Sequence, residues 1–176
     1  MENSRDLFWE LLEPEYDRAI MFCRKLMGDR DQGDDLFQDA LVLAYTRLRS
    51  LRDRSAFRPW LYRVMVNAFR SKARRPWWRR LSPLTREMEL SLAGDDPIPT
   101  HEARRWLRRA MAGLSPDDRA LISLYELEGW SVAELAEMHS MTESAVKVRL
   151  FRARDRMKKT LMKLVHKDEM DGEDAG

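Results

Sequence analysis

The segment RLRSLRDRSAFRPWLYRVMVNAFRSKARRPWWRR, residues 47–80, is strongly basic and carries the period of an α-helix. It contains twelve arginines and lysines and a single acid, Asp53. Apolar side chains recur within it at steps of three and four residues, as on a helix face that packs inward. These side chains are Phe57, Trp60, Leu61, Val64 and Ala68. We therefore expect a helix from about Pro59 to Arg75 that combines a buried face with a basic surface.

The other side of this helix carries a row of polar side chains. Arg63, Asn67, Arg70 and Arg74 recur at steps of four, three and four residues, which places them along one edge. Arginines on such an edge can contact phosphates, and an asparagine amide can make a paired contact with adenine. A solvated basic face is the alternative interpretation, and only the rest of the chain decides between the two.

Charge is distributed unevenly along the chain. The 176 residues suffice for one or two small domains, and the formal net charge is only +2. Bases concentrate in the middle and after Lys147, whereas the chain ends on Asp168, Glu169, Asp171, Glu173 and Asp174. This pattern indicates a body that binds a polyanion and an acidic tail at residues 166–176 that we expect to be disordered.

The composition also argues against several classes of protein. The single cysteine, Cys23, excludes an internal disulfide framework and a cysteine-cluster zinc site, and its apolar neighbours predict that it is buried. No apolar run approaches the roughly 20 residues that span a bilayer. The N-terminus lacks the pattern of a secretory signal. We therefore expect a cytoplasmic protein.

Residues 4–77 predict a first helical domain. A short helix at 4–12 and a second from Pro14 to Gly28 precede a turn at 29–33 and a third helix, with Asp34 and Asp35 near its start. The inward side of this third helix holds Leu36, Ala40 and Leu43. Its outward side forms an acidic and amide patch of Asp35, Gln38, Asp39 and Val42.

Residues 78–100 predict a flexible linker, and residues 101–165 a second helical domain, so that the fold class is all-α. Ser115 is the expected N-cap of one helix, and Ser131 with Glu134 forms a capping box. Thr142 begins a long helix after a three-residue turn, which is the layout of a helix-turn-helix. Its outward positions are Ser144, Lys147, Val148, Phe151 and Arg152. A plain helical hairpin remains the alternative for this unit.

The order of these parts resembles the extracytoplasmic-function sigma factors. The stretches DDLFQDAL (34–41) and SAFRPWLYRVMVN (55–67) are similar to their region 2. The part from Leu114 to Arg154 is similar to their region 4. Either motif alone would be weak, but their joint occurrence in this order is specific and covers most of the chain.

This resemblance implies a protein that binds core RNA polymerase, through its clamp helices and flap, and recognises promoter DNA without covalent chemistry. It implies no cofactor, metal or small-molecule substrate. It assigns Asp35, Gln38 and Asp39, which lie beside Val42, to the polymerase surface. For the −10 element it implies a flipped-base pocket of Arg54, Ser55, Phe57 and Asn67, beside the basic edge of Arg63, Arg70 and Arg74. For the −35 element it implies Lys147, Val148, Phe151 and Arg152 beside Ser144, with Arg149 nearer the phosphates. An anti-sigma factor, often membrane-bound, is a further expected partner.

Three positions depart from the family pattern. Ser71 stands where an acid is frequent, so the end of the basic helix can be fixed differently. Ser140 replaces the usual glycine of the helix-turn-helix turn. Val148 replaces a small polar residue and can touch a thymine methyl without donating a hydrogen bond.

Two other classes of function agree less well with the sequence. A helix-turn-helix regulator that acts without replacing a sigma subunit fits the second domain, but the first domain shows neither a receiver pattern nor a ligand-binding pattern. An enzyme acting on nucleic acid is disfavoured because His101, His139 and His166 are scattered and no glycine-rich phosphate loop occurs.

Overall fold

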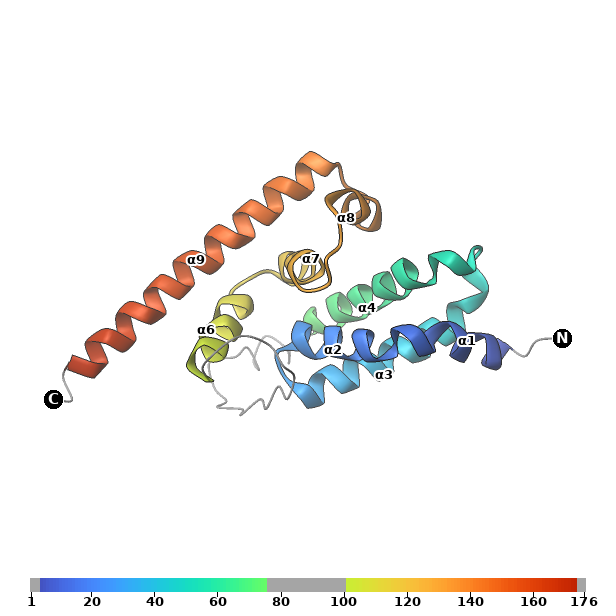
Figure 1. Ribbon diagram of the computed structural model, residues 1–176, viewed down its shortest axis with the longest axis horizontal. Coiled ribbons are helices and arrows are strands. Elements are labelled where there is room, and N and C mark those ends of the chain that lie inside the picture. The colour runs from blue at the N-terminus through green and yellow to red at the C-terminus, as the bar shows by residue number, and fades with distance from the viewer. Residues whose placement is uncertain (1–3, 76–100, 174–176) are drawn as a thin grey trace. The chain divides into compact units, whose positions relative to one another are not determined.

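The structure, a computed structural model, describes residues 4–75 and 101–173, all in helices, turns and short connections (Figure 1). No strand occurs in these two ranges, so the all-α prediction is confirmed. The chain divides into two compact units, residues 1–80 and 81–176. Among the described residues, no helix combines the length and apolar character needed to cross a membrane.

The first unit packs its helices around one aromatic and aliphatic core. Its elements are α1 (Ser4–Leu12), a 3₁₀ turn (Glu13–Glu15), α2 (Tyr16–Met27), α3 (Arg30–Arg47), two further 3₁₀ turns (Leu48–Ser50 and Arg54–Ala56) and α4 (Phe57–Ala73). Helix α3 packs against α2 and α4, and α2 also contacts α4. The position of α4 brings the basic segment onto the same unit as the acidic face of α3.

Helix α4 is buried over more of its circumference than its sequence period predicted. Phe57, Leu61, Val64 and Ala68 lie in the core as expected, while Trp60 is only half-buried. The core also takes Tyr62, Met65, Val66, Phe69 and Ala73, which the expected stripe omitted. The reason is that α4 contacts both α2 and α3, so two of its faces are covered.

Helix α3 begins four residues earlier than the sequence suggested. Asp29 is its N-cap, and the Asp29 carboxylate accepts a hydrogen bond from the backbone N–H of Gln32 at 2.8 Å. Gly33 therefore lies inside the helix, where an added Cβ would be 2.4 Å from Arg24 Cα. The glycine is needed for a close crossing of α2 and α3, which an ion pair of Arg24 with Asp34 at 2.6 Å further secures.

Replacing Gly33 by alanine is expected to destabilise the first unit by about 1–3 kcal/mol, because the two helix backbones must separate. Gly113→Ala is the matched control, since its Cβ would meet nothing nearer than 3.5 Å. Urea unfolding followed by circular dichroism measures both variants. Equal stability of the Gly33→Ala protein and the parent chain would contradict the proposed reason for this glycine.

The second unit consists of α6 (His101–Ala112), α7 (Pro116–Glu126), α8 (Val132–His139) and α9 (Glu143–Glu173). Its predicted helix starts are confirmed: Ser115 Oγ accepts from the N–H of Asp118 at 3.1 Å, and Ser131 and Glu134 form a complete capping box. Helix α9 contacts α6, α7 and α8, so it supplies the common wall of the unit. The inner side of α9 is buried and carries Val146, Leu150 and Ala153.

The predicted disordered tail is wrong for most of its length, because the α9 backbone continues to Glu173. Residues 158–171 contain no proline or glycine and are rich in lysine, leucine, methionine and other strong helix formers. The clustered terminal acids suggested disorder, but the helix propensity of residues 158–171 favours continuation of α9 through this stretch.

Candidate nucleic-acid and polymerase interfaces

The polar edge of α4 has the arrangement that the sequence predicted. Arg63, Asn67 and Arg74 are exposed, and Arg70 is half-buried. Arg70 Nη1 donates to the Asn67 side-chain oxygen at 3.4 Å, and Arg74 Nη2 donates to Ser71 Oγ at 3.4 Å. The row is therefore one continuous polar edge, in which Ser71 accepts a hydrogen bond from a basic neighbour.

The turn before α4 is held by Asp53. Its carboxylate accepts hydrogen bonds from the Ser55 hydroxyl at 2.7 Å and from the Ser55 N–H at 2.9 Å. Both hydrogen bonds lower the pKa of Asp53, and the bond from the Ser55 hydroxyl has the larger effect. Arg54 and Ser55 are exposed on this turn, so the structure places them beside the start of the basic helix.

Phe57 does not have the environment that a base-stacking role requires. It is only 3% exposed, and its ring packs against Phe8 and Trp60 at centroid distances of 6.2 and 5.8 Å. The assignment of Phe57 to the wall of a base pocket is therefore wrong. Trp60, half-buried in the first turn of α4, is the nearby ring with an accessible surface. Sequence reasoning missed Trp60 because its spacing assigned it to the inner face.

The acidic patch of α3 is a single exposed face, as predicted. Asp35, Gln38 and Asp39 are exposed, and Val42, at the C-terminal end of the patch, is 64% exposed. Lys72 Nζ of α4 lies 3.8 Å from Asp39 Oδ2. The basic helix and the acidic face are thus in electrostatic contact at one edge.

The outer side of α9 forms what we call the recognition face. It consists of Ser144, Lys147, Val148, Phe151 and Arg152, all of them exposed. Two of them are apolar: Phe151 is 72% exposed and Val148 is 47% exposed. An exposed phenylalanine and valine between two bases on the second helix of a helix-turn-helix suit a surface that contacts base edges as well as phosphates.

Arg149 has a partner within the protein. It is half-buried, and its Nε and Nη2 atoms donate to Asp118 Oδ1 of α7 at 2.9 and 2.7 Å. The other oxygen, Asp118 Oδ2, accepts from Ser115 Oγ at 2.8 Å and faces Arg156 Nη1 at 3.7 Å. This arrangement gives Arg149 the task of holding α9 against the start of α7, in place of the expected phosphate contact.

The turn between α8 and α9 keeps the geometry that glycine favours. Ser140 adopts φ 53° and ψ 47°, in the left-handed region. Its N–H donates to the carbonyl oxygens of Ala136 and Glu137, and the N–H of Met141 donates to Ala136 O at 2.8 Å. Ser140 is therefore held in a conformation that strains a residue with a side chain.

Ser140→Gly is expected to stabilise the second unit by about 1 kcal/mol. Glycine removes the penalty of roughly 1–2 kcal/mol for a left-handed residue, and part of this is offset because glycine loses more conformational entropy on folding. Denaturant unfolding of the full chain measures the change, with Ser140→Ala as a control that keeps the strain. A Ser140→Gly protein no more stable than Ser140→Ala would contradict this account.

Each of the two units matches the model of a known protein family. Residues 11–79 match the family model for sigma-70 region 2, and residues 104–157 match the model for sigma-70 region 4. An RNA polymerase sigma-E factor of Streptomyces avermitilis is 30% identical over 88% of this chain and 84% of the relative. The ECF RNA polymerase sigma factor SigM of Mycobacterium tuberculosis is 30% identical over 90% of this chain and 79% of the relative.

Two solved structures have a fold similar to that of this chain. CnrH, determined in complex with the cytosolic domain of CnrY, is 25% identical with a TM-score of 0.62, covering 92% of this chain and 91% of CnrH. The sigma factor RpoE of Bartonella quintana, determined with the anti-sigma factor NepR, shares the fold with a TM-score of 0.67 at 24% identity, covering 88% of this chain and 96% of RpoE. Region 2 and region 4 in this order, with relatives along nearly the whole length, show that the chain belongs to the extracytoplasmic-function sigma factors of the sigma-70 family.

Proposed function

We propose that three described faces divide the work of this sigma factor: α3 docks on polymerase, α4 recognises the −10 element and α9 recognises the −35 element. As a member of its family the chain binds core RNA polymerase and directs promoter-specific transcription initiation. The observation that carries the division of labour is the polar edge of α4, which is basic, exposed and adjacent to the acidic face of α3. The proposal places the protein in the cytoplasm, where polymerase and promoters meet, and gives it no covalent chemistry.

The −10 element is the proposed ligand of α4 and the turn before it. Asn67 is exposed at the middle of the polar edge, where its amide can pair with a base. Arg63, Arg70 and Arg74 neutralise phosphates along the strand. Arg54 and Ser55 lie in the turn just before the start of α4. Trp60, in the first turn of this helix, takes the stacking role that the family resemblance assigned to Phe57.

The −35 duplex is the proposed ligand of the recognition face on α9. Lys147 and Arg152 carry the charge for base edges and phosphates. Val148 and Phe151 supply apolar contacts of the kind that suit a thymine methyl. Ser144 is nearest the start of the helix, where helix-turn-helix proteins contact base edges. Arg149 fixes the angle of this helix through Asp118.

Polymerase and an anti-sigma factor are the proposed protein partners. The acidic face of Asp35, Gln38, Asp39 and Val42 is assigned to the clamp helices, and the second unit to the flap. A membrane-bound anti-sigma factor is one form that the inhibitor can take. The sigma factor RpoE, which was solved in complex with the anti-sigma factor NepR, supports such a partner.

Tethering explains how two small units suffice for promoter choice. A good bidentate base contact discriminates by only about 1–3 kcal/mol. When both units belong to one chain, the second contact becomes intramolecular and gains effective concentration. The intervening stretch of residues 78–100 has the length to span tens of ångströms, at roughly 3.3 Å per residue when extended.

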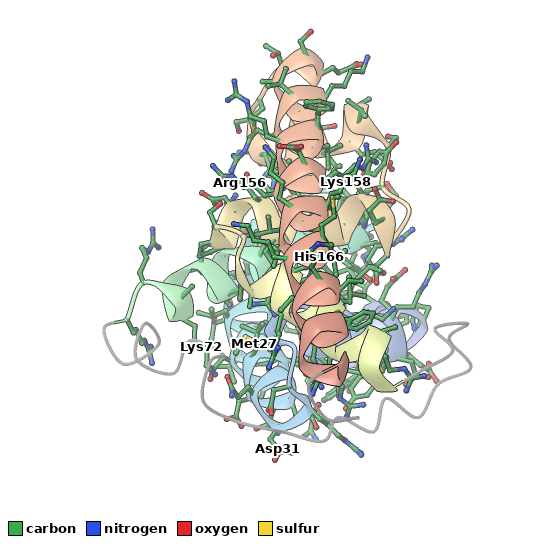
Figure 2. All side chains as sticks on the ribbon, turned by 90° about the vertical axis from the view of Figure 1, so that its left-hand side faces the viewer. Met27, Asp31, Lys72, Arg156, Lys158 and His166 are labelled. Carbon is green, nitrogen blue, oxygen red and sulfur yellow. The ribbon has the colours of Figure 1, made fainter. Side chains whose placement is uncertain are left out.

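Lys147→Ala and Arg152→Ala are each expected to weaken −35 discrimination by about 1–3 kcal/mol, because each removes a charged contact from the groove. Selection from a promoter pool randomised at the −35 element measures the effect. Lys158→Ala is the control: it changes an exposed lysine on the same helix, about 16 Å further along the axis at 1.5 Å per residue. In Figure 2, Lys158 lies near the middle of α9, whereas the recognition face is confined to the first three turns of this helix. Unchanged selection in both variants would rule out this recognition face.

A gel-shift experiment separates this proposal from a regulator that acts without replacing a sigma subunit. The chain alone is expected to bind promoter duplex weakly, and to bind it tightly once core polymerase is added. Tight, sequence-specific binding by the isolated chain, unaffected by core polymerase, would favour the regulator.

A further inference from the structure

Three exposed aromatic side chains of the first unit have no part in the proposed promoter or polymerase contacts. Within residues 4–75, Trp9 is 48% exposed, Tyr45 is 46% exposed and Tyr16 is 39% exposed. They come from α1, α3 and α2 respectively. Large aromatic side chains that remain in water are costly, and when several gather they mark interaction surfaces.

These rings are held in place from below by two core phenylalanines. Trp9 and Tyr45 both meet Phe8 edge-on, with centroid distances of 5.9 and 5.5 Å. Tyr16 meets Phe37 in the same way at 5.2 Å. Because a ring fixed on the core loses little freedom when a partner covers it, such rings are efficient anchors for binding.

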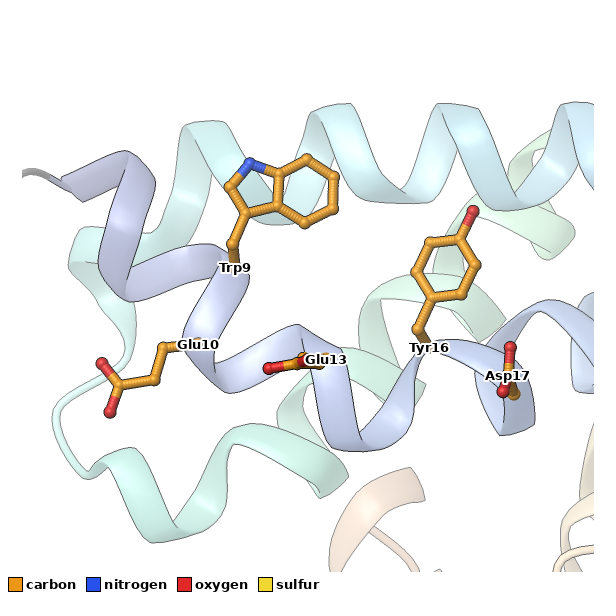
Figure 3. A pocket seen from close by; sticks show the side chains of 5 residues that line it. All are labelled: Trp9, Glu10, Glu13, Tyr16 and Asp17. Carbon is orange, nitrogen blue, oxygen red and sulfur yellow. The ribbon is translucent and has the colours of Figure 1, made fainter.

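Acids border two of the rings. A pocket over α1 and α2 is lined by Trp9, Glu10, Glu13, Tyr16 and Asp17, and we call it the N-terminal pocket. Figure 3 shows both rings projecting to the same side of the segment that carries the three acids. All three carboxylates are exposed, and the pocket lining contains no lysine or arginine. The pocket therefore repels nucleic acid and anionic lipid and attracts cations.

We propose that the N-terminal pocket binds a cationic amphipathic helix of a partner protein. Apolar side chains of that helix cover Trp9 and Tyr16, and its arginines or lysines pair with Glu10, Glu13 and Asp17. Helices α1 and α2 offer no strand edge, so an extended peptide would gain no backbone hydrogen bonds here. The residues that line this pocket are different from those of the acidic face of α3 and of the polar edge of α4.

The probe for this proposal is a fluorescently labelled helical peptide of about four turns, with leucine along one face and arginine on both flanks, titrated into the full chain. Two twin peptides accompany it, one with glutamate for arginine and one with serine for leucine. The leucine–arginine peptide is expected to bind, and each twin to bind at least about tenfold more weakly, since pairing and ring burial both contribute. If the serine twin binds as tightly as the leucine–arginine peptide, the affinity comes from charge attraction alone, and the proposal is overturned.

Variants of the chain locate the binding site. Trp9→Ala and the double variant Glu13→Lys/Asp17→Lys are each expected to weaken binding at least about tenfold, while Trp9→Phe retains it. Leu127→Ala and Glu137→Lys, which alter exposed side chains of the second unit, serve as matched controls and leave it unchanged. The double variant changes only exposed side chains. If Trp9→Ala lowers the stability of the first unit, the double variant alone therefore decides the test.

Two further results would overturn the proposal. One is unchanged affinity in the double variant. The other is concentration-dependent self-association of the parent chain that Trp9→Ala abolishes, because the occupant would then be a second copy. Reversal of Asp35 and Asp39 on α3 is expected to leave peptide binding intact, which keeps this surface distinguishable from the polymerase contact.

Discussion

Charge reversal at Asp35 and Asp39 is expected to weaken binding to core RNA polymerase by at least about 100-fold, since like charges placed across an interface cost several kcal/mol. Both carboxylates are exposed on the face of α3 that also carries Val42, so their replacement by lysine leaves the core intact. Fluorescence anisotropy of the labelled chain against core polymerase measures the affinity. An unchanged melting temperature confirms that the first unit still folds.

A control separates docking from an effect on the basic helix. Asp39 lies 3.8 Å from Lys72, so its reversal also disturbs α4. Lys72→Met removes that contact without touching the acidic face, and its affinity for polymerase is expected to stay within a few-fold of the parent chain. If Lys72→Met loses as much affinity as the double reversal, or if the reversal loses none, α3 is not the docking face.

Asn67→Ala is expected to impair opening of the −10 region by about 10- to 100-fold while leaving closed-complex formation nearly unchanged, because a paired base contact contributes about 1–3 kcal/mol once the base is exposed. Phosphate contacts from Arg63 and Arg74 remain to support the closed complex. Permanganate reactivity of unpaired thymines measures opening, and a binding assay at low temperature measures the closed complex.

Ser71→Ala is the matched control for Asn67→Ala. It alters an exposed polar side chain one turn away on α4, where the serine only accepts a hydrogen bond from Arg74. Both steps are expected to remain near the values of the parent chain. An Asn67→Ala protein that loses both steps equally would show that the asparagine contributes general DNA affinity and not base capture.

Features fixed by neighbouring residues were predicted well from the sequence. Ser115, Ser131 with Glu134, and Gly28 mark helix ends because their caps involve residues within a few positions, and the structure shows those caps. The acidic face of α3 and the polar edge of α4 followed from helical period alone. The family stretches then supplied roles that no local pattern contains.

Features that depend on residues distant in sequence were not predicted. Gly33 was taken for a turn residue because the backbone of Arg24, which requires it, belongs to another helix. The family resemblance assigned Arg149 to phosphates, and no local pattern indicated its partner Asp118, which lies 31 positions earlier. Phe57 has both an inward spacing and a place in a motif, and only the packing on Phe8 and Trp60 decides between them.

Run-off transcription with core polymerase over a promoter library randomised at both elements tests the account most directly. The account predicts that adding the parent chain selects one pair of −10 and −35 sequences, that Lys147→Ala or Arg152→Ala relaxes only the −35 choice, and that Asn67→Ala affects only the −10 choice. Transcription that shows no sequence preference with the chain present, or none above core polymerase alone, would contradict it.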